Sequence, residues 1–211
     1  MDDKKAASRW SNLIKSDDWM SVWIGFLILI IFMAGFTFKA PKFKWVTDGS
    51  FQTKIEKWVT KVDGLAKDAD AKKEDALATE AAALKTALDA KDRKAISESA
   101  KKFEAAAKET KDGDLKKKAE KLGKDIAGTA GATVGKVFSK DNLMLALYLL
   151  VGLWVLGMIG MILMGLPAGK FAAGFPIIFI LSALAFFIAG NDTVSYYGLE
   201  VVFWALIFGL L

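Results

Sequence analysis

Hydrophobic and charged positions are separated along this chain into long blocks. Three stretches contain no charged residue: 20 residues at 19–38, 28 residues between Asp141 and Lys170, and 21 residues between Lys170 and Asp192. About 20 helical residues span ~30 Å, which is the thickness of the hydrocarbon core of a bilayer. We therefore predict three transmembrane helices, the last two forming a hairpin around the Gly/Pro-rich turn at 165–170.

The first apolar stretch has two interpretations, a cleaved signal peptide and an uncleaved anchor. The apolar core of a signal peptide is about 7–15 residues long and ends at a small-residue cleavage site. Here the apolar stretch is longer, and its only pair of small residues, Ala34-Gly35, is followed by Phe36, Thr37 and Phe38 instead of a cleavage site. Trp19 and Trp23 lie at its start, where an interfacial aromatic belt is expected. These features favour an uncleaved anchor.

Most of the charge lies in one insert, residues 39–141, which holds 42 of the 53 charged side chains. Its apolar residues recur at helical spacing, which predicts three or four amphipathic helices packed as hairpins or a small bundle. The predicted fold class is therefore an all-α membrane protein with a soluble Ala/Lys-rich helical insert. The predicted buried quartets are Phe51/Ile55/Trp58/Val62, Leu77/Ala81/Leu84/Leu88, Ile96/Ala100/Phe103/Ala107 and Leu115/Ala119/Leu122/Ile126.

Three polar clusters are predicted to separate the helices of the insert: Asp63-Gly64, residues 89–92 and residues 112–114. Acid-before-base pairs at i,i+4 are predicted to stabilise the exposed faces. These pairs are Asp63/Lys67, Asp68/Lys72, Glu98/Lys102, Glu104/Lys108 and Glu120/Lys124.

The insert carries a net charge of +6, which raises the question of nucleic-acid or anion binding. Acidic and basic residues are interspersed, and no aromatic residue accompanies a basic cluster as a base-stacking surface requires. A solvated helical face is the interpretation we favour, and nucleic acid is not an expected partner. The densest cluster, residues 116–118 with Lys121 and Lys124, suits lipid headgroups or simply keeps a helix soluble.

Residue types exclude most catalytic chemistry. The chain has no Cys and no His, so disulfides, thiolate nucleophiles and the usual zinc or haem ligands are absent. No charged residue lies within the three spans, although transporters usually mark an ion path with one. Gly174-Phe175-Pro176 could break a helix at a substrate site, but Pro in the first turn of a helix is tolerated. We predict no enzyme activity, no catalytic, cofactor or metal residues and no cofactor; substrate-binding residues stay unassigned.

Basic residues in the short flanks predict the orientation. The tail carries Lys4, Lys5, Arg9 and Lys15, the hairpin turn carries Lys170, and the 191–200 loop carries none. The tail is therefore predicted to be cytoplasmic and the insert extracytoplasmic. The predicted segments are a tail at 1–18, a span at 19–38, the insert at 39–141, a hairpin at 142–191, and at 192–211 a loop with the start of a fourth span. Since 201–211 is too short to cross a bilayer, we expect the natural protein to continue further.

Three apolar segments resemble the N-terminal part of the bacterial YeiH-type sulfate exporter family. They are SDDWMSVWIGF at 16–26, LSALAFFIAG at 181–190, and YGLEVVFWALIFGL at 197–210, the last similar to a YGLE-x-x-x-W-A-L-x-x-G-L motif. The resemblance covers about half of the chain and leaves the insert unmatched. It implies a longer multi-pass protein of a bacterial inner (plasma) membrane, with inverted-repeat transporter architecture and anion export. It transfers no binding residues.

Three functions compete. The first is a multi-pass secondary transporter for a small inorganic anion such as sulfate, of which this chain is the N-terminal portion. The second is a membrane receptor with an extracytoplasmic helical domain; the immediate return of the chain into the membrane after 165–170 argues against it. The third is an accessory subunit whose insert binds a partner. Expected partners are the lipid bilayer, a small anion and further copies of the chain in a homo-oligomer.

Overall fold

The computed structural model describes residues 16–35 and 39–210. Residues 1–15 of the predicted tail and residues 36–38 of the first predicted span lie outside the described residues. All regular elements in the described part are α-helices, which confirms the predicted fold class. The described residues divide into two compact units: an apolar unit of residues 16–35, 39–42, 140–186 and 205–210, and a bundle unit of residues 43–139 and 187–204.

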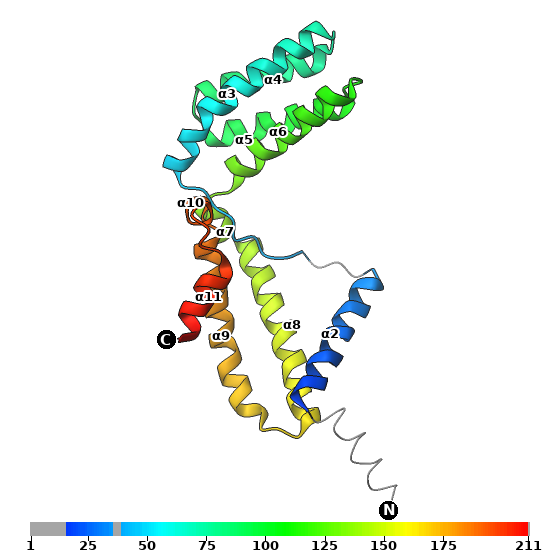
Figure 1. The fold of residues 1–211 in the computed structure, drawn as a ribbon, viewed down its shortest axis with the longest axis vertical. Helices are drawn as coiled ribbons and strands as arrows, with labels where there is room; N and C mark the ends of the chain where they lie inside the picture. The colour runs from blue at the N-terminus through cyan, green and yellow to red at the C-terminus, as the bar shows by residue number, and fades with distance from the viewer. Residues whose placement is uncertain (1–15, 36–38, 211) are drawn as a thin grey trace, which may run out of the picture. The chain divides into compact units, whose positions relative to one another are not determined.

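The apolar unit contains two helices that are long and apolar enough to cross a membrane. These are α8 (Lys140–Met164) and α9 (Ala168–Ala189), which form the predicted hairpin (Figure 1). Only 6% of the most apolar stretch of each helix is buried. A helix in the core of a soluble protein would have this surface covered, whereas lipid is a suitable solvent for it. Two shorter apolar helices, α2 (Asp17–Met33) and α11 (Val201–Leu210), complete the set, and the last residues of α9 and the first of α11 belong to the bundle unit.

Two glycines of α8, Gly157 and Gly160, lie where another helix approaches closely. A Cβ atom on Gly157 would lie 2.2 Å from the Phe171 ring, so this glycine makes room for the ring between α8 and α9. A Cβ on Gly160 would lie 3.2 Å from Cδ1 of Ile24, where α2 packs on α8. Gly152 has nothing within 4 Å of such an atom. The small residues therefore set two specific contacts.

Pro176 lies further inside its helix than the sequence indicates. Helix α9 begins at Ala168 and continues through Pro176 to Ala189 without a break. The expectation that Pro176 occupies the first turn is therefore wrong, because α9 starts before Lys170 and includes much of the predicted turn. The unbroken helix also gives no support to a substrate site at this proline.

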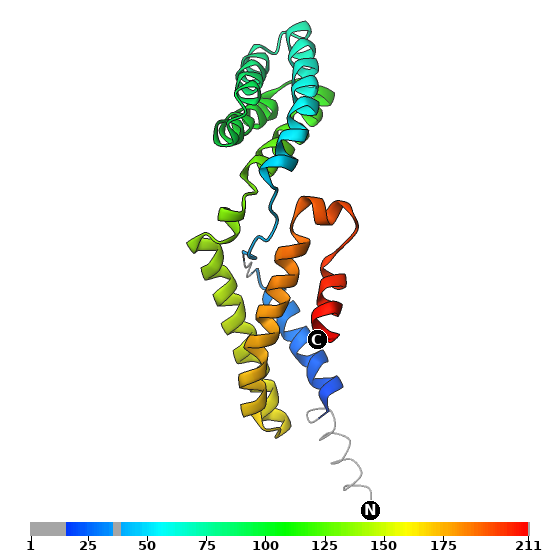
Figure 2. The same ribbon diagram turned by 90° about the vertical axis from the view of Figure 1, so that its left-hand side faces the viewer.

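The bundle unit is built on four helices: α3 (Asp48–Ala71), α4 (Asp75–Asp89), α5 (Arg93–Glu109) and α6 (Gly113–Gly131). Figures 1 and 2 show them as two hairpins, α3 with α4 and α5 with α6. All sixteen residues of the four predicted quartets are buried in one core, extended by Leu65 and Ala69. Two short helices, α7 (Val134–Val137) and α10 (Asp192–Tyr196), belong to the same unit.

One predicted helix break is wrong. Helix α3 passes straight through Asp63-Gly64 and ends at Ala71. The chain turns instead at Lys73, whose φ of +57° is left-handed although lysine has no special preference for it. The apolar repeat that continues through Leu65 and Ala69 outweighs the helix-breaking tendency of one glycine. The other two predicted breaks are confirmed, with Asp92 and Asp112 capping α5 and α6.

Ion pairs form at two of the five predicted i,i+4 positions. Asp63 contacts Lys67 at 3.1 Å, and Glu104 contacts Lys108 at 2.8 Å. Lys72 bonds Asp112 at 2.8 Å rather than Asp68, and thereby connects the end of α3 to the start of α6. Asp63 also bonds Lys85 of α4 at 2.5 Å. Tertiary packing therefore pairs Lys72 with a carboxylate on another helix in place of the predicted one on its own helix.

Candidate functional site

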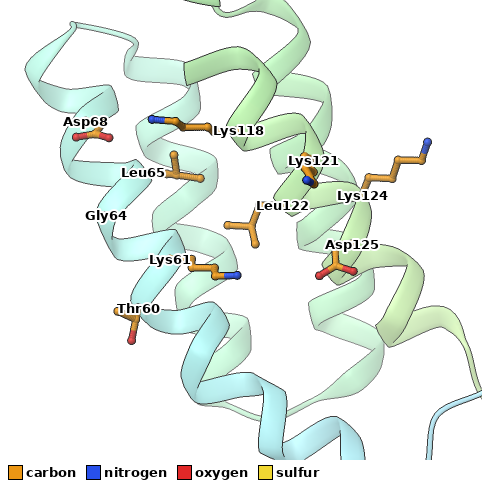
Figure 3. A pocket seen from close by; sticks show the side chains of 10 residues that line it. All are labelled: Thr60, Lys61, Gly64, Leu65, Asp68, Lys118, Lys121, Leu122, Lys124 and Asp125. Atoms are coloured by element: carbon orange, nitrogen blue, oxygen red, sulfur yellow. The ribbon is translucent and has the colours of Figure 1, made fainter. Parts of the chain in front are cut away.

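A basic cleft lies between α3 and α6 in the bundle unit, with a volume of about 720 Å³ (Figure 3). The helix α3 wall carries Lys61 and Asp68, and the α6 wall carries Lys118, Lys121, Lys124 and Asp125. Four lysines and two aspartates leave the lining with a net charge of +2. All six side chains belong to exposed residues, so the cleft is an open, solvated feature.

Helical spacing explains how each wall is formed. Lys61 and Gly64 lie three residues apart on α3, and Lys118, Lys121 and Leu122 lie three and four residues apart on α6, so each set shares one face. Leu65 and Leu122 lie at the floor, each only 8% exposed. Gly64 has no atom within 4 Å of an added Cβ, so its wall is open to the cleft.

Some described lysines of the bundle form ion pairs, whereas many others, including those that line the cleft, form none. Lys54, Lys72 and Lys85 each bond a carboxylate at 2.5–2.8 Å. Within the described ranges, no ion pair is formed by Lys61, Lys118 or Lys121, and none by the two aspartates of the cleft. In Figure 3 the Lys61 side chain extends from α3 toward α6, and that of Lys118 extends from α6 toward α3. In the same view Lys61 lies at the level of Asp125 and Lys118 at the level of Asp68, so the two ammonium groups do not converge.

The pKa values of the paired groups shift in the direction expected for surface ion pairs. Hydrogen bonds from Lys85 and Lys67 lower the pKa of Asp63, and a hydrogen bond from Lys72 with one from the Leu115 amide lowers that of Asp112. The same pairing raises the pKa of Lys72 and Lys85. These groups stabilise charged contacts between helices, and none is poised for acid–base chemistry near neutral pH.

Arg93 connects the end of α6 to the start of α3 at one end of the bundle. Its guanidinium donates to the backbone oxygens of Ala130, Ala132 and Val46 at 2.7–2.9 Å and to the Asp48 carboxylate at 2.8 Å. It also lies 4.6 Å from the centre of the Phe51 ring. With 16% of its side chain exposed, Arg93 satisfies carbonyl groups at the C-terminus of α6, where a positive charge is favoured.

A junction of Trp45 with residues 187–193 connects the start of the insert to the end of α9 and the residues that follow it, within the bundle unit. The Trp45 indole stacks on Phe187 at 5.2 Å and donates to its backbone oxygen at 2.8 Å. The Trp45 amide donates to Gly190, and the Asp192 amide donates to the Trp45 carbonyl oxygen. Lys54 adds an ion pair with Asp192 at 2.6 Å. This segment is therefore held by backbone, aromatic and charged contacts together.

The charged residues at the predicted span ends have different surroundings. Asp192 is paired with Lys54 in the junction, so it has a structural partner that the sequence did not indicate. Lys170 lies in the first turn of α9, and Glu200 precedes α11. Among the described residues no group of acidic side chains could hold a metal ion. Sequence reasoning singled out the basic cluster that supplies Lys118, Lys121 and Lys124 to the cleft, but it missed the α3 wall, Arg93 and the junction. The partners in these contacts are separated by up to about 140 positions.

The fold and composition define this chain as an α-helical membrane protein carrying a charged helical bundle. Over 47 residues it is 47% identical to the UPF0324 membrane protein RB9488 of Rhodopirellula baltica. That match covers 22% of this chain and 9% of the relative, so the two share a short membrane-protein segment and most of the relative has no counterpart here. No family model and no solved structure matches the chain.

Proposed function

We propose that this chain is the N-terminal portion of a multi-pass secondary transporter that exports a small inorganic anion such as sulfate. The observation that carries the proposal is the apolar hairpin α8–α9, followed by the motif at 197–210 that is similar to YeiH-type exporters. The similarity to a UPF0324 membrane protein supports the same family, since UPF0324 is the YeiH family.

The proposed anion path lies outside the described spans. Between Asn142 and Met164, and again between Phe171 and Ala189, there is no charged residue, and α9 is unbroken. Anion sites in secondary transporters are expected at discontinuous helices, whose N-termini attract negative charge. We place that site in spans that follow this portion of the protein.

Transport by the protein translated from the complete coding sequence tests the proposal. Proteoliposomes loaded with radiolabelled sulfate should release it faster than protein-free liposomes, and unlabelled external sulfate should alter the rate by exchange or competition. Phosphate and chloride loading measures selectivity. Release no faster than from protein-free liposomes for all three anions contradicts anion transport and favours the accessory-subunit hypothesis.

The proposed orientation, with a cytoplasmic N-terminus and an extracytoplasmic insert, has a separate test. Because the chain has no Cys, single substitutions Lys117→Cys in α6 and Lys170→Cys at the hairpin turn report unambiguously on access. A membrane-impermeant maleimide should label Lys117→Cys in intact cells and Lys170→Cys only after permeabilisation. The opposite labelling pattern reverses the orientation.

A further inference from the structure

We propose that one end of the bundle unit binds the headgroups of acidic phospholipids through two exposed lysines, Lys44 and Lys136, and the exposed rings of Phe138, Tyr196 and Tyr197. These five residues are called the headgroup surface below. The proposal goes beyond the transport function, because it concerns the lipid around the protein and involves no transported anion. Each ammonium group carries three donors for phosphate oxygens. Each lysine contacts its own headgroup, so the two need no common binding position.

Part of the headgroup surface lies beside the end of a helix that is long and apolar enough to cross a membrane. Phe187 belongs to the last turn of that helix, α9. The Trp45 ring stacks on Phe187 at 5.2 Å, and the Phe138 ring lies 5.3 Å from it. Lys44 directly precedes Trp45, and Lys136 lies two residues before Phe138. Since a helix that crosses the hydrocarbon core ends at the headgroup region, both lysines are expected at the level of the lipid phosphates.

Exposed aromatic rings accompany the lysines. The exposed fraction is 55% for Phe138, 84% for Tyr196 and 72% for Tyr197. The two tyrosines lie at the end of α10, just before the apolar helix α11. Figures 1 and 2 show α7 and α10 at the same height, at the end of the bundle unit opposite the α3–α4 turn. Aromatic rings are favoured where the membrane meets water, so a lipid surface explains their exposure.

The unpaired charge at this end of the unit is mainly positive. Within residues 16–35 and 39–210, Lys44 and Lys136 form no ion pair. Asp192 is bonded to Lys54 at 2.6 Å, so its charge is compensated. Glu200, exposed before α11, weakens the attraction without cancelling it. An acidic lipid surface attracts each nearby lysine, and salt screens this attraction over about 8–10 Å.

The apolar unit independently places exposed lysines at the start of its first long helix, α8. The Asn142 side chain accepts a hydrogen bond from the Lys42 amide at 2.7 Å and donates one to the Lys42 carbonyl oxygen at 2.9 Å. These bonds fix Lys42 beside the first turn of α8, which also contains Lys140 and Asp141. Both lysines are exposed. Each unit therefore holds two exposed lysines at a span end through its own contacts.

Hydrogen exchange of the full chain in nanodiscs of two compositions tests the proposal. Nanodiscs of neutral phosphatidylcholine are compared with nanodiscs that also contain phosphatidylglycerol, at the same low ionic strength and with one chain in each nanodisc. The amides of residues 134–138 and 194–198 should exchange about threefold more slowly in the acidic nanodiscs. Added salt should remove this difference. The amides of α4, outside the headgroup surface, are the internal reference, and equal exchange in the two compositions overturns the proposal.

Matched substitutions separate the headgroup surface from a general effect of charge. K44Q/K136Q should abolish most of the lipid-dependent protection and leave exchange in neutral nanodiscs unchanged. K101Q/K117Q removes the same charge from exposed positions of α5 and α6 and should retain the protection. E200Q should increase it, because a repelling carboxylate is lost. Equal loss of protection in both lysine pairs, or a decrease in E200Q, contradicts the proposal.

The aromatic rings have a separate readout. Y196S/Y197S should speed the exchange of residues 194–198 in both kinds of nanodisc, because the rings enter the interface of any lipid. Unchanged exchange contradicts their contact with the membrane. Protection that ignores lipid composition and arises only when two chains share a nanodisc assigns the surface to a second copy of the chain and overturns the proposal. None of these measurements involves transport, so a failure here leaves the transport proposal standing, and the reverse also holds.

Discussion

Arg93 forms hydrogen bonds, an ion pair and a ring contact at one end of the bundle. Its guanidinium donates to four backbone oxygens, contributed by Val46, Thr129, Ala130 and Ala132. Several donors fixed in one plane allow a single side chain to satisfy a whole helix terminus, which a lysine cannot reproduce. The contribution of Arg93 to stability therefore comes mainly from satisfied carbonyl groups.

Replacing Arg93 tests this role. Arg93→Gln should destabilise the bundle by about 2–4 kcal/mol, because it removes a partly buried charge and leaves carbonyl groups without donors. Arg93→Lys should recover only part of that loss. Chemical unfolding of the full chain in detergent, followed by far-UV circular dichroism, measures the effect. Lys94→Gln, at the exposed neighbouring position, is the control, and an equal loss there would contradict the specific role of Arg93.

Gly123 and Gly128 form a matched pair on the same helix. A Cβ on Gly123 would lie 3.0–3.1 Å from the Cβ, Cα and N atoms of Glu104, whereas one on Gly128 would meet nothing within 4 Å. Gly123→Ala should destabilise the α5–α6 contact by about 1–3 kcal/mol through overpacking. Gly128→Ala should stabilise α6 by about 0.5–1 kcal/mol through higher helix propensity. The same unfolding assay compares them, and a shift of the same sign for both variants contradicts the close approach.

At the scale of the helices, charged pairs connect elements whose packing is otherwise apolar. Asp63 connects α3 to Lys85 of α4, and Asp112 connects the start of α6 to Lys72 at the end of α3. Asp112 also accepts the Leu115 amide as a helix cap. Because both aspartates are ionised and bonded in the folded state, the stability of the bundle depends on pH.

The lowered pKa of Asp63 and Asp112 fixes the direction of that dependence. The contribution of these two carboxylates to the free energy of unfolding is complete above the unfolded-state pKa of 3.8. It is lost as the pH falls through the lower folded-state pKa. In D63N/D112N the amide retains the helix cap but cannot titrate. The thermal midpoint should therefore fall less steeply below about pH 4 than in the wild type. Parallel curves from pH 7 to pH 2 would contradict this assignment.

Raised lysine pKa values predict a second transition on the alkaline side. Pairing with Asp112, Asp63 and Glu104 raises the pKa of Lys72, Lys85 and Lys108. Their contribution is present below the unfolded-state pKa of 10.5 and is lost as the pH rises above it. The two transitions leave a broad plateau of stability around neutral pH.

At the scale of the whole molecule, the junction of Trp45 with residues 187–193 makes the bundle unit discontinuous in sequence. Residues 43–139 and 187–204 form one compact unit, although an apolar hairpin separates them along the chain. The Trp45 carbonyl and amide pair with the backbone of Asp192 and Gly190, and Asn191 caps α10 through the amides of Thr193 and Val194. Within the bundle unit, the start of the insert is therefore bonded to the residues that end and follow α9.

Loosening the junction should be visible in hydrogen exchange. Trp45→Ala removes the stacked ring and the indole donor, so the amides of Asp192, Thr193 and Val194 should exchange faster in the full chain. Trp45→Phe retains a ring but loses the hydrogen bond to Phe187 and should give an intermediate rate. Lys44→Ala, at the exposed neighbouring position, should leave these amides unchanged. Unchanged protection in Trp45→Ala would contradict a junction held by this side chain.

The sequence by itself determined the helices, the apolar hairpin and the buried faces of the bundle. Phe51, Leu84, Phe103 and Ile126 could be assigned to a core because helical periodicity is local, and it survives any arrangement of the helices. The same reasoning failed at Asp63-Gly64, because a single glycine is a weaker signal than an apolar repeat that continues beyond it.

Only the tertiary structure decided which distant residues meet. Lys61 and Lys118 line the same cleft, Arg93 reaches the end of α6, and Trp45 stacks on Phe187. Spacing along one helix predicts which side chains share a face, but it carries no information about the neighbouring helix that this face meets. The physical reason is that such contacts arise from the packing of whole helices, in which the free energy of burying the core fixes the partners of every surface side chain.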